Sequence, residues 1–566
     1  MKDTNQRLFL AVALCLAATF LWSILFKPKT LPAGPSAAIA GAASPSAAQA
    51  VPSPVSVSAL GAGAGADVPR GTSTPRPPAQ RVALESDKLH LVLTSEGAAL
   101  ESVELKGQKF LRHKVGSKEG SPVNLIQASP GEPLTLSTLV LGADPSAPPL
   151  IRADAPYEVV RSEPLSVTFR TESAGVTVTK TISVDPDHYR LNLAVDVRSA
   201  GALTGHLAVL GASHSEAPTG GGFFSRSASV PARTICKAGD KLERVAVGAK
   251  SPSWDGPGAA AFAGIDEQYF LMAVLPPAGS ASTCHLEAQP QGAMVSTLTL
   301  PLSLLAGGTT ALSFNIFAGP KDTEELAAVA PILKDAVDLG FWAVIANLLL
   351  GVMKFFHKVI PGHNWGIAII LLTVSMKALT FPLQHKSMKS MQEMQRIQPQ
   401  LEELKKKYPN DTQRQNQEQM KLFKEHGVNP MGSCLPMLIQ MPIWFALYTT
   451  LQVSVELYNA AFIPGWLNDL TAKDPYYVLP VAMGITMILT QVLTPTPMSN
   501  PSQKTMGYAM SGFFSLLMLN LPSGLTLYIF VNNVLSIMQQ MYLRRAMRPP
   551  APPASGQTVA VSAARV

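Results

Sequence analysis

The sequence lacks the residue groupings that metal, redox and nucleotide chemistry require. Its four cysteines are scattered over 566 residues, and no pair has the close spacing of zinc or redox motifs. The run GAGAGAD at residues 61–67 lacks the flanking strand, helix and lysine of a phosphate loop. A net charge of +7, spread over so long a chain, indicates no nucleic-acid partner. We therefore predict no cofactor, no metal and no specific nucleic-acid recognition.

Large apolar residues are nearly absent from two stretches. Residues 29–80 and residues 549–566 are rich in Ala, Pro and Ser, so neither can bury a core. We expect both to be disordered, the first as a linker and the second as a C-terminal tail.

An apolar stretch at residues 8–26 is about long enough to cross a bilayer as a helix, and Lys2 and Arg7 precede it. A cleavable signal peptide usually has a shorter apolar core and small residues before its cut site. Trp22 and Lys27 stand there instead. We therefore predict an uncleaved N-terminal transmembrane anchor over residues 1–28.

Residues 81–320 contain many short runs in which apolar and polar residues alternate, such as LHLVLTSEG and SVTFRTESAGVTVTKTISV. Such runs are typical of half-buried strands, and their number predicts a large antiparallel β-sandwich. The anchor would place this domain in the periplasm. Cys236 and Cys284 fall within it and could form a disulfide there, but the sequence does not give their separation.

Residues 321–360 change to a helical pattern, with Leu326, Val329 and Leu333 on one stripe, followed by FWAVIANLLLGVMKFFHKVI. The second half is apolar but carries Lys354 and His357 on a wetter side, which favours an amphipathic helix in the plane of the membrane interface. A full membrane span is the alternative.

Five further apolar segments lie at about 365–383, 431–451, 475–493, 505–520 and 522–542. Basic residues follow the first segment and the last, which predicts that both of these ends are cytoplasmic. Five crossings satisfy both assignments, whereas counting residues 341–360 as another span would break the parity. The predicted fold is thus that of a multi-pass membrane protein. It has an N-terminal anchor, a periplasmic β-sandwich, and a core of five helices over residues 361–548.

One lysine interrupts the first of these segments, in the run LLTVSMKALTFPL. A lysine at the centre of a membrane helix is unfavourable by about 2.5 to 3.5 kcal/mol, so such groups usually face protein or a wet cavity. Thr373 lies four residues before Lys377, on the same face of the helix. Together they indicate a polar stripe turned inward, although the lysine could instead extend to the cytoplasmic surface.

Other membrane segments add the polar residues Gln440, Asn532, Asn533 and Ser536. A watery pocket within the bilayer would accommodate them all, but hydrogen bonds between packed helices would also explain some of them. The segment 505–520 is short against a hydrocarbon thickness of about 30 Å, which suggests local thinning of the bilayer.

Residues 384–427 are expected to form a cytoplasmic hairpin of two helices with a turn near residues 409–411 and a break near Pro399. Methionines recur along it with the spacing of a helix face. Such a stripe is commonly the seam of a hairpin, but flexible methionines also suit a surface that receives varied apolar segments. The candidate substrate contacts of the hairpin are Met388, Met391 and Met394.

Three longer runs resemble a known family: NPMGSCLPMLIQMPIWFALY, DPYYVLPVAMGITM and LPSGLTLYIFVNNVLSIMQQ. They are similar to segments of the YidC/Oxa/Alb family of membrane protein insertases. The resemblance is extensive over residues 360–548 and rests only on architecture in the outer domain. With the anchor, the outer domain and the basic tail, the chain has the layout of a Gram-negative bacterial member.

The resemblance implies a hydrophilic groove, open to cytoplasm and lipid but closed outside, where a nascent membrane segment docks before it moves sideways into the bilayer. Lys377, with Thr373 as its neighbour, takes the groove's positive position, where the family more often has an arginine. Lysine keeps the charge but loses the planar fork of donors. Met441 and Trp444 match positions that contact the passing substrate. The implied partners are nascent membrane proteins, the ribosome, membrane lipids and the Sec translocon (SecYEG, SecDF).

The predicted function is that of an insertase and chaperone, not an enzyme, which acts alone or with the Sec translocon. A solute or ion transporter is the alternative, because the same intramembrane charge would serve it, but no internal repeat appears. An intramembrane protease is less well supported, since Ser523 has no histidine in a neighbouring span. The candidate groove residues are Thr373, Lys377, Gln440, Met441, Trp444, Asn532 and Asn533.

Overall fold

The structure of the protein is a computed structural model. It describes residues 78–113, 120–127, 129–144, 146–215, 231–249, 251–409, 411–427, 430–493 and 501–546. The predicted N-terminal anchor, nearly all of the predicted linker, and the C-terminal tail lie outside these ranges.

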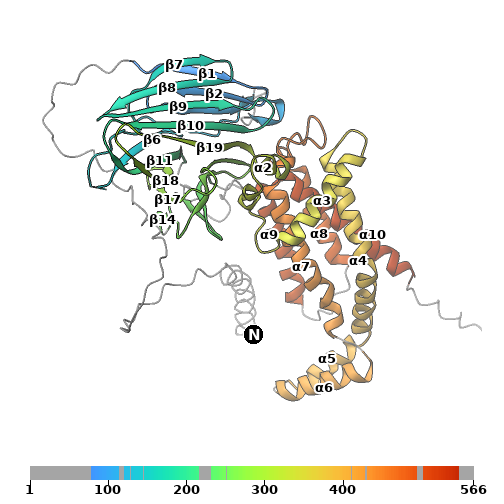
Figure 1. Ribbon diagram of the computed structural model, residues 1–566. Helices are drawn as coiled ribbons and strands as arrows, with labels where there is room; N and C mark the ends of the chain where they lie inside the picture. Colours follow the sequence, from blue (N-terminus) through green and yellow to red (C-terminus); the bar gives the residue numbers. More distant parts are fainter. Residues whose placement is uncertain are drawn as a thin grey trace, which may run out of the picture. The chain divides into compact units, whose positions relative to one another are not determined.

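The described residues between 81 and 320 form a β domain in which every paired strand is antiparallel (Figure 1). The larger sheet has the order β13 (Lys241–Ala246), β12 (Arg233–Ala238), β15 (Ala260–Asp266), β16 (Phe270–Leu275), β19 (Thr309–Pro320), β10 (Arg190–Ser199), β9 (Val176–Val184), β8 (Ser166–Ser173) and β7 (Glu158–Glu163). The second sheet has the order β14 (Ser253–Asp255), β17 (Thr283–Ala288), β18 (Ala293–Leu304), β11 (Leu203–His214) and β6 (Thr138–Gly142). Smaller sheets contain β1 (Arg81–Glu85), β2 (Leu89–Thr94) and β3 (Ala99–Leu105), and β4 (Leu111–His113) with β5 (Gly120–Pro122).

Alternation in the sequence explains these strands. In β9, Val176, Val178 and Ile182 are buried in the domain core, and threonines between them face outward. Burying such a side chain contributes roughly 1.5–3 kcal/mol, so the alternation fixes both the face and the register. The prediction of a large β-rich domain is confirmed.

A disulfide joins the two sheets. It links Cys236 on β12 to Cys284 on β17, and both cysteines are buried in the domain core. This answers the question of pairing that the sequence left open.

Two short helical elements follow the last strand: α2 (Thr323–Val329) and η3 (Pro331–Ala336). The Asp322 carboxylate caps α2 by accepting from Glu324 N at 2.8 Å. Leu326, Leu333 and Ala336 are fully buried in the core of the β domain. These elements are therefore part of that domain's packing.

The next helix, α3 (Ala343–Val359), is apolar on two faces. Ala346, Leu349, Leu350 and Met353 are buried against the helical region, whereas Val344, Leu348, Phe355 and Val359 are exposed. An exposed apolar stripe of this kind suits contact with lipid. Whether α3 lies in the interface or crosses the membrane stays a prediction.

The remaining helices are α4 (Trp365–Arg396), α5 (Gln398–Lys407), α6 (Thr412–Glu425), α7 (Pro430–Val453), α8 (Val478–Leu493), α9 (Pro501–Leu517) and α10 (Ser523–Ala546). Each of the five predicted apolar segments coincides largely with one of them. In the part of the chain that is described, one helical stretch, Trp365–Ser387, is long and apolar enough to cross a membrane, and α8 is a shorter apolar helix. The number of crossings therefore stays a prediction.

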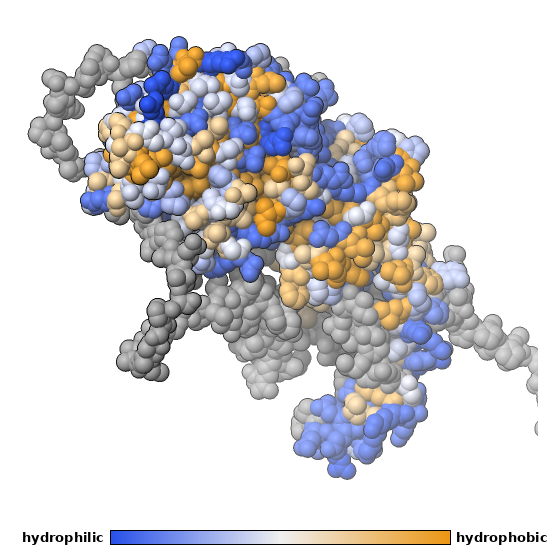
Figure 2. Space-filling view, in the orientation of Figure 1, coloured by the Kyte–Doolittle hydropathy of each residue, from blue (hydrophilic) through white to orange (hydrophobic). Residues whose placement is uncertain are grey.

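Helices α4, α7, α8 and α10 pack together with α3 around one apolar cluster. Figure 2 shows apolar residues gathered over this bundle and hydrophilic residues over the hairpin of α5 and α6. The break that Pro399 predicts falls at Ile397, and Pro399 becomes the second residue of α5, where its missing N–H has no helical acceptor to lose.

Candidate functional site

Lys377 on α4 points toward α10. Its Nζ donates to Ser536 Oγ at 2.9 Å and, more weakly, to Gln384 Oε1 at 3.4 Å. Ser536 Oγ in turn donates to Asn532 O at 2.8 Å. The lysine is only partly buried. A positive charge therefore lies between two helices of the bundle, held by uncharged partners.

Thr373 lies one turn before Lys377 but has a different environment. It is buried, and its hydroxyl donates to Ile369 O at 2.7 Å within the same helix. Its hydrogen-bonding capacity as a donor is thus used by the backbone. The predicted polar stripe continues instead through Gln384 and Ser536.

The predicted groove residues of α7 differ in their exposure to solvent. Gln440 Nε2 approaches Tyr528 Oη at 3.5 Å, which links α7 to α10. Met441 is 36% exposed, whereas Trp444 is half-buried and stacks on Tyr448. Met441 is thus the residue of this group most accessible to an incoming chain.

Several polar atoms on α4 and α10 are buried without a hydrogen-bond partner among the residues that the structure describes. They include Asn533 Nδ2 on α10, Gln539 Nε2 one to two turns further along, and His385 Nδ1 beside Gln384. Buried amide and imidazole nitrogens normally find partners, so such atoms indicate a place for water or a polar ligand. Gln384 and His385 were not predicted from the sequence, although both are polar and follow Lys377 by about two helical turns.

The helices of the bundle differ in how extensively they contact one another. Helix α10 packs along α8 and α4, α4 packs along α7, and α9 packs along α8. Among the described residues, α7 and α9 share no extensive contact.

At one end of the bundle, residues 454–477 between α7 and α8 form a packed loop. Leu467 and Leu470 are buried, and Asp474 accepts from Trp466 Nε1 at 2.8 Å and from Leu479 N at 2.7 Å. The loop also caps α10, because Leu470 O accepts from Gly524 N at 2.9 Å. This end is therefore filled by side chains and fixed backbone.

Of the three candidate methionines of the hairpin, the structure describes the side chain of one. Met394 is buried with Ile397 and Phe423 in a small seam. The side chains of Met388 and Met391 lie outside the described residues. On α6, Met420 is 52% exposed beside a depression of about 490 Å³ lined by amide and lysine side chains, a feature that the sequence analysis did not single out.

These features define a bundle of apolar helices with one lysine held between α4 and α10, joined to a large β domain. Two family descriptions match the sequence: "60Kd inner membrane protein" over residues 355–550 and "YidC periplasmic domain" over residues 81–352. A membrane protein insertase YidC of Anaeromyxobacter sp. (strain Fw109-5) is 43% identical over 84% of this chain and 86% of its own length. One from Anaeromyxobacter dehalogenans (strain 2CP-C) is 40% identical over 98% of this chain and its own full length.

The chain therefore belongs to the YidC family of membrane protein insertases. A relative from Geobacter metallireducens, 34% identical over 96% of this chain and 99% of its own length, has the same name. A solved structure of an active YidC insertase is similar over 83% of this chain at 18% identity, with a TM-score of 0.36. The family predicted from the sequence is confirmed, and with it a location in the membrane.

Proposed function

We propose that this protein takes nascent membrane segments into a cationic, hydrophilic groove between α4, α7 and α10 and releases them sideways into the inner membrane. The observation that carries the proposal is the position of Lys377, whose ammonium bonds Ser536 across the gap between α4 and α10. The unpartnered nitrogen of Asn533 on α10 supports it, because water or a polar stretch of a client would satisfy that atom.

The energy comes from the bilayer. Burying a client's apolar helix in lipid is favourable, but the short polar tail at its leading end must first cross the hydrocarbon. A wet groove with a positive charge offers this tail, and above all an acidic one, an intermediate position. One high barrier is thereby divided into smaller ones. The proposal assigns no catalytic chemistry to any residue.

We place the exit of the client between α7 and α9. The limited contact between the described residues of these helices supports this choice, as does the exposure of Met441 on α7. Residues 454–477 would close the outer end of the groove, since Leu467 and Leu470 are buried there.

The topology belongs to the same proposal. Five core crossings would leave the hairpin and the C terminus in the cytoplasm and the β domain in the periplasm. The disulfide between Cys236 and Cys284 supports this side for the β domain, because such bonds persist outside the reducing cytosol. The ribosome would approach the cytoplasmic elements, and the Sec translocon would act with the protein for some clients.

The test is insertion of a single-span client with a short acidic tail into proteoliposomes that contain the purified protein. We expect Lys377→Ala and Lys377→Glu to slow insertion and Lys377→Arg to support it. Wild-type rates for both Lys377→Ala and Lys377→Glu would refute a role for the charge. Flux of a small solute through the same vesicles, without crosslinks from position 441 to a stalled nascent chain, would favour the transporter instead.

A further inference from the structure

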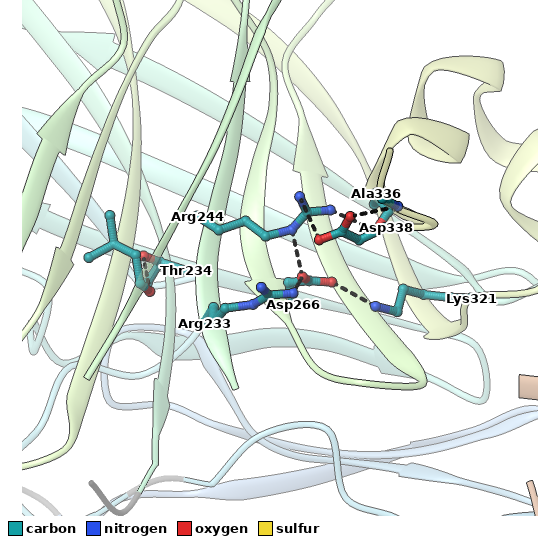
Figure 3. A network of polar contacts seen from close by, with 9 residues as sticks. Arg233, Thr234, Arg244, Asp266, Lys321, Ala336 and Asp338 are labelled. Carbon is teal, nitrogen blue, oxygen red and sulfur yellow. Dashed lines mark hydrogen bonds and ion pairs between the residues drawn. The ribbon is translucent and has the colours of Figure 1, made fainter. Parts of the chain in front are cut away.

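Asp266 lies at the end of β15, and its carboxylate is fully buried among three cations (Figure 3). Oδ2 accepts from Arg233 Nη2 and from Arg244 Nε, both at 2.9 Å. Oδ1 accepts from Lys321 Nζ at 3.0 Å. The three cations come from β12, from β13 and from the residue after β19, so the network gathers distant parts of the chain around one acid.

Such a network is a poor way to make a domain merely stable. Removing charges from water is costly, and apolar residues of similar volume often stabilise a core at least as well. The benefit of a buried ionic network lies in geometry, because charged partners with fixed hydrogen bonds permit one arrangement only. The geometry that this network fixes is that of the segment leading into α3.

Arg244 makes the connection to that segment. While its Nε bonds Asp266, its Nη2 donates to Ala336 O at 2.9 Å, and its Nη1 lies 3.7 Å from Asp338. Ala336 is the last residue of η3. Lys237 on β12 pairs with Asp335 of the same segment. Asp266 thus orients one arginine, and that arginine holds the end of η3 by its carbonyl group.

The connection from this point to the helical bundle is short. Ala336 is buried in the core of the β domain, and Leu339, three residues later, is buried in the core of the helices. Helix α3 starts at Ala343. The segment between Ala336 and Ala343 is too short to act as a flexible linker between the β domain and α3.

We propose that Asp266 and Arg244 are positioning residues that fix the start of α3 and thereby the placement of this helix against α4 and α7. They act on insertion through α3 and touch no client. Loss of the network would free residues 331–342 and let α3 shift relative to the bundle.

The test compares variants of the full chain in lipid nanodiscs by hydrogen–deuterium exchange and in proteoliposomes by client insertion. In Arg244→Gln, amides in residues 331–342 should exchange at least about tenfold faster, because removing one partner of a buried charge network is strongly destabilising. Exchange in β9 and β10 should not change. Insertion should slow at least about fivefold, at the lower end of coupling between distant sites.

Arg244→Lys provides a second variant if Arg244→Gln fails to fold. It keeps a charge beside Asp266 but cannot bridge Asp266 and Ala336 together, so the same local exchange should appear. Arg161→Gln is the control, since Arg161 pairs with Glu163 on β7, at the opposite edge of the same sheet from β13 and β12. The proposal is overturned if residues 331–342 stay protected in a folded Arg244 variant. It is equally overturned if exchange rises throughout the β domain, or if faster local exchange leaves insertion unchanged.

Discussion

The ammonium group of Lys377 on α4 and the hydroxyl of Ser536 on α10 are 2.9 Å apart, although the two residues are separated by 159 positions in the sequence. The hydroxyl donates a hydrogen bond to the carbonyl oxygen of Asn532, so its oxygen is oriented to accept from the lysine. This pair directs the ammonium toward α10, and with the bond to Gln384 it uses two of the three N–H groups of the ammonium.

We expect Ser536→Ala to loosen this arrangement without removing the charge. A hydrogen bond to a charged group contributes about 1.5–3 kcal/mol when buried and less at a partly exposed site such as this one. Insertion should slow modestly, and in a Lys377→Met background the serine substitution should have no further effect. A double-mutant cycle on insertion rates measures this coupling, and strict additivity would contradict it.

Met441 and Leu447 lie on the same helix, α7, but differ in solvent exposure. Met441 is 36% exposed, and Leu447 is 1% exposed in the helical core. A photo-crosslinking residue at position 441 should capture a stalled nascent chain, whereas one at position 447 should not. Equal crosslinking at both positions would show that the client does not pass along this face of α7.

The packing of the hairpin predicts that alanine substitution destabilises it at one methionine and has no effect at another. Met394 is packed with Ile397 and Phe423, so Met394→Ala should loosen the hairpin by about 2 kcal/mol, the low end for buried methionines because the cluster is small. Met420 is exposed, so Met420→Ala should leave the hairpin's stability unchanged. Amide exchange in α5 and α6 distinguishes the two. A large effect of Met420→Ala on exchange would mean that the seam is assigned wrongly.

The disulfide should stabilise the β domain by constraining its unfolded state. Cys236 and Cys284 are 48 residues apart, and closing a loop of that size contributes about 4 kcal/mol in the chain-entropy account. Cys236→Ala with Cys284→Ala should therefore lower the urea concentration at which proteolysis of the domain begins. A thiol-reactive label should react with neither cysteine in urea-unfolded wild-type protein unless a reductant is added. Labelling of Cys236 or Cys284 in the unfolded protein without reductant would contradict the bond.

Lys180 should make the stability of the β domain depend on pH. The side chain is fully buried, and burial lowers its pKa from 10.5 to about 7, although the carbonyl groups of Gly97, Ala98 and Leu136 accept from Nζ and favour the ammonium. Between these two pH values the unfolded chain binds the proton and the folded domain does not. Unfolding therefore takes up a proton, and stability rises with pH across this window.

The slope should be at most about 1.4 kcal/mol per pH unit. Urea midpoints at pH 7 and pH 9 measure it, with Lys180→Met as the variant that should lack the dependence. A fall in the wild-type midpoint over this range, or an equal rise in the variant, would show that Lys180 is not the group responsible.

The regular strands and helices could be predicted from the sequence, because apolar residues recur along them with the spacing of a strand or a helix face. Val176 and Val178 alternate with polar residues, and this predicts a strand. Lys180 occupies the next position of the same buried face. The pattern shows that it lies inward but not what satisfies its charge, since its three carbonyl partners come from turns far away in the chain.

The candidate site could be predicted only in part, because the sequence does not show which distant segments come into contact. Lys377 stands out because it interrupts an apolar run, and the family resemblance assigns it a role. Its partner Ser536 and the network around Asp266 depend on contacts between distant segments. Charged residues such as Arg244 and Lys321, met singly in the sequence, look like ordinary surface residues. Only the fold brings them to one carboxylate.

The packed loop between α7 and α8 also has an electrical consequence. If the groove is wet, water enters the bundle from one side and stops where Leu467 and Leu470 fill the interior. The membrane voltage would then fall mainly across this thin hydrophobic layer rather than across the whole bilayer. At about 2.3 kcal/mol per elementary charge for each 100 mV, a charged client tail resting against that layer would experience most of the field in its final few ångströms of travel.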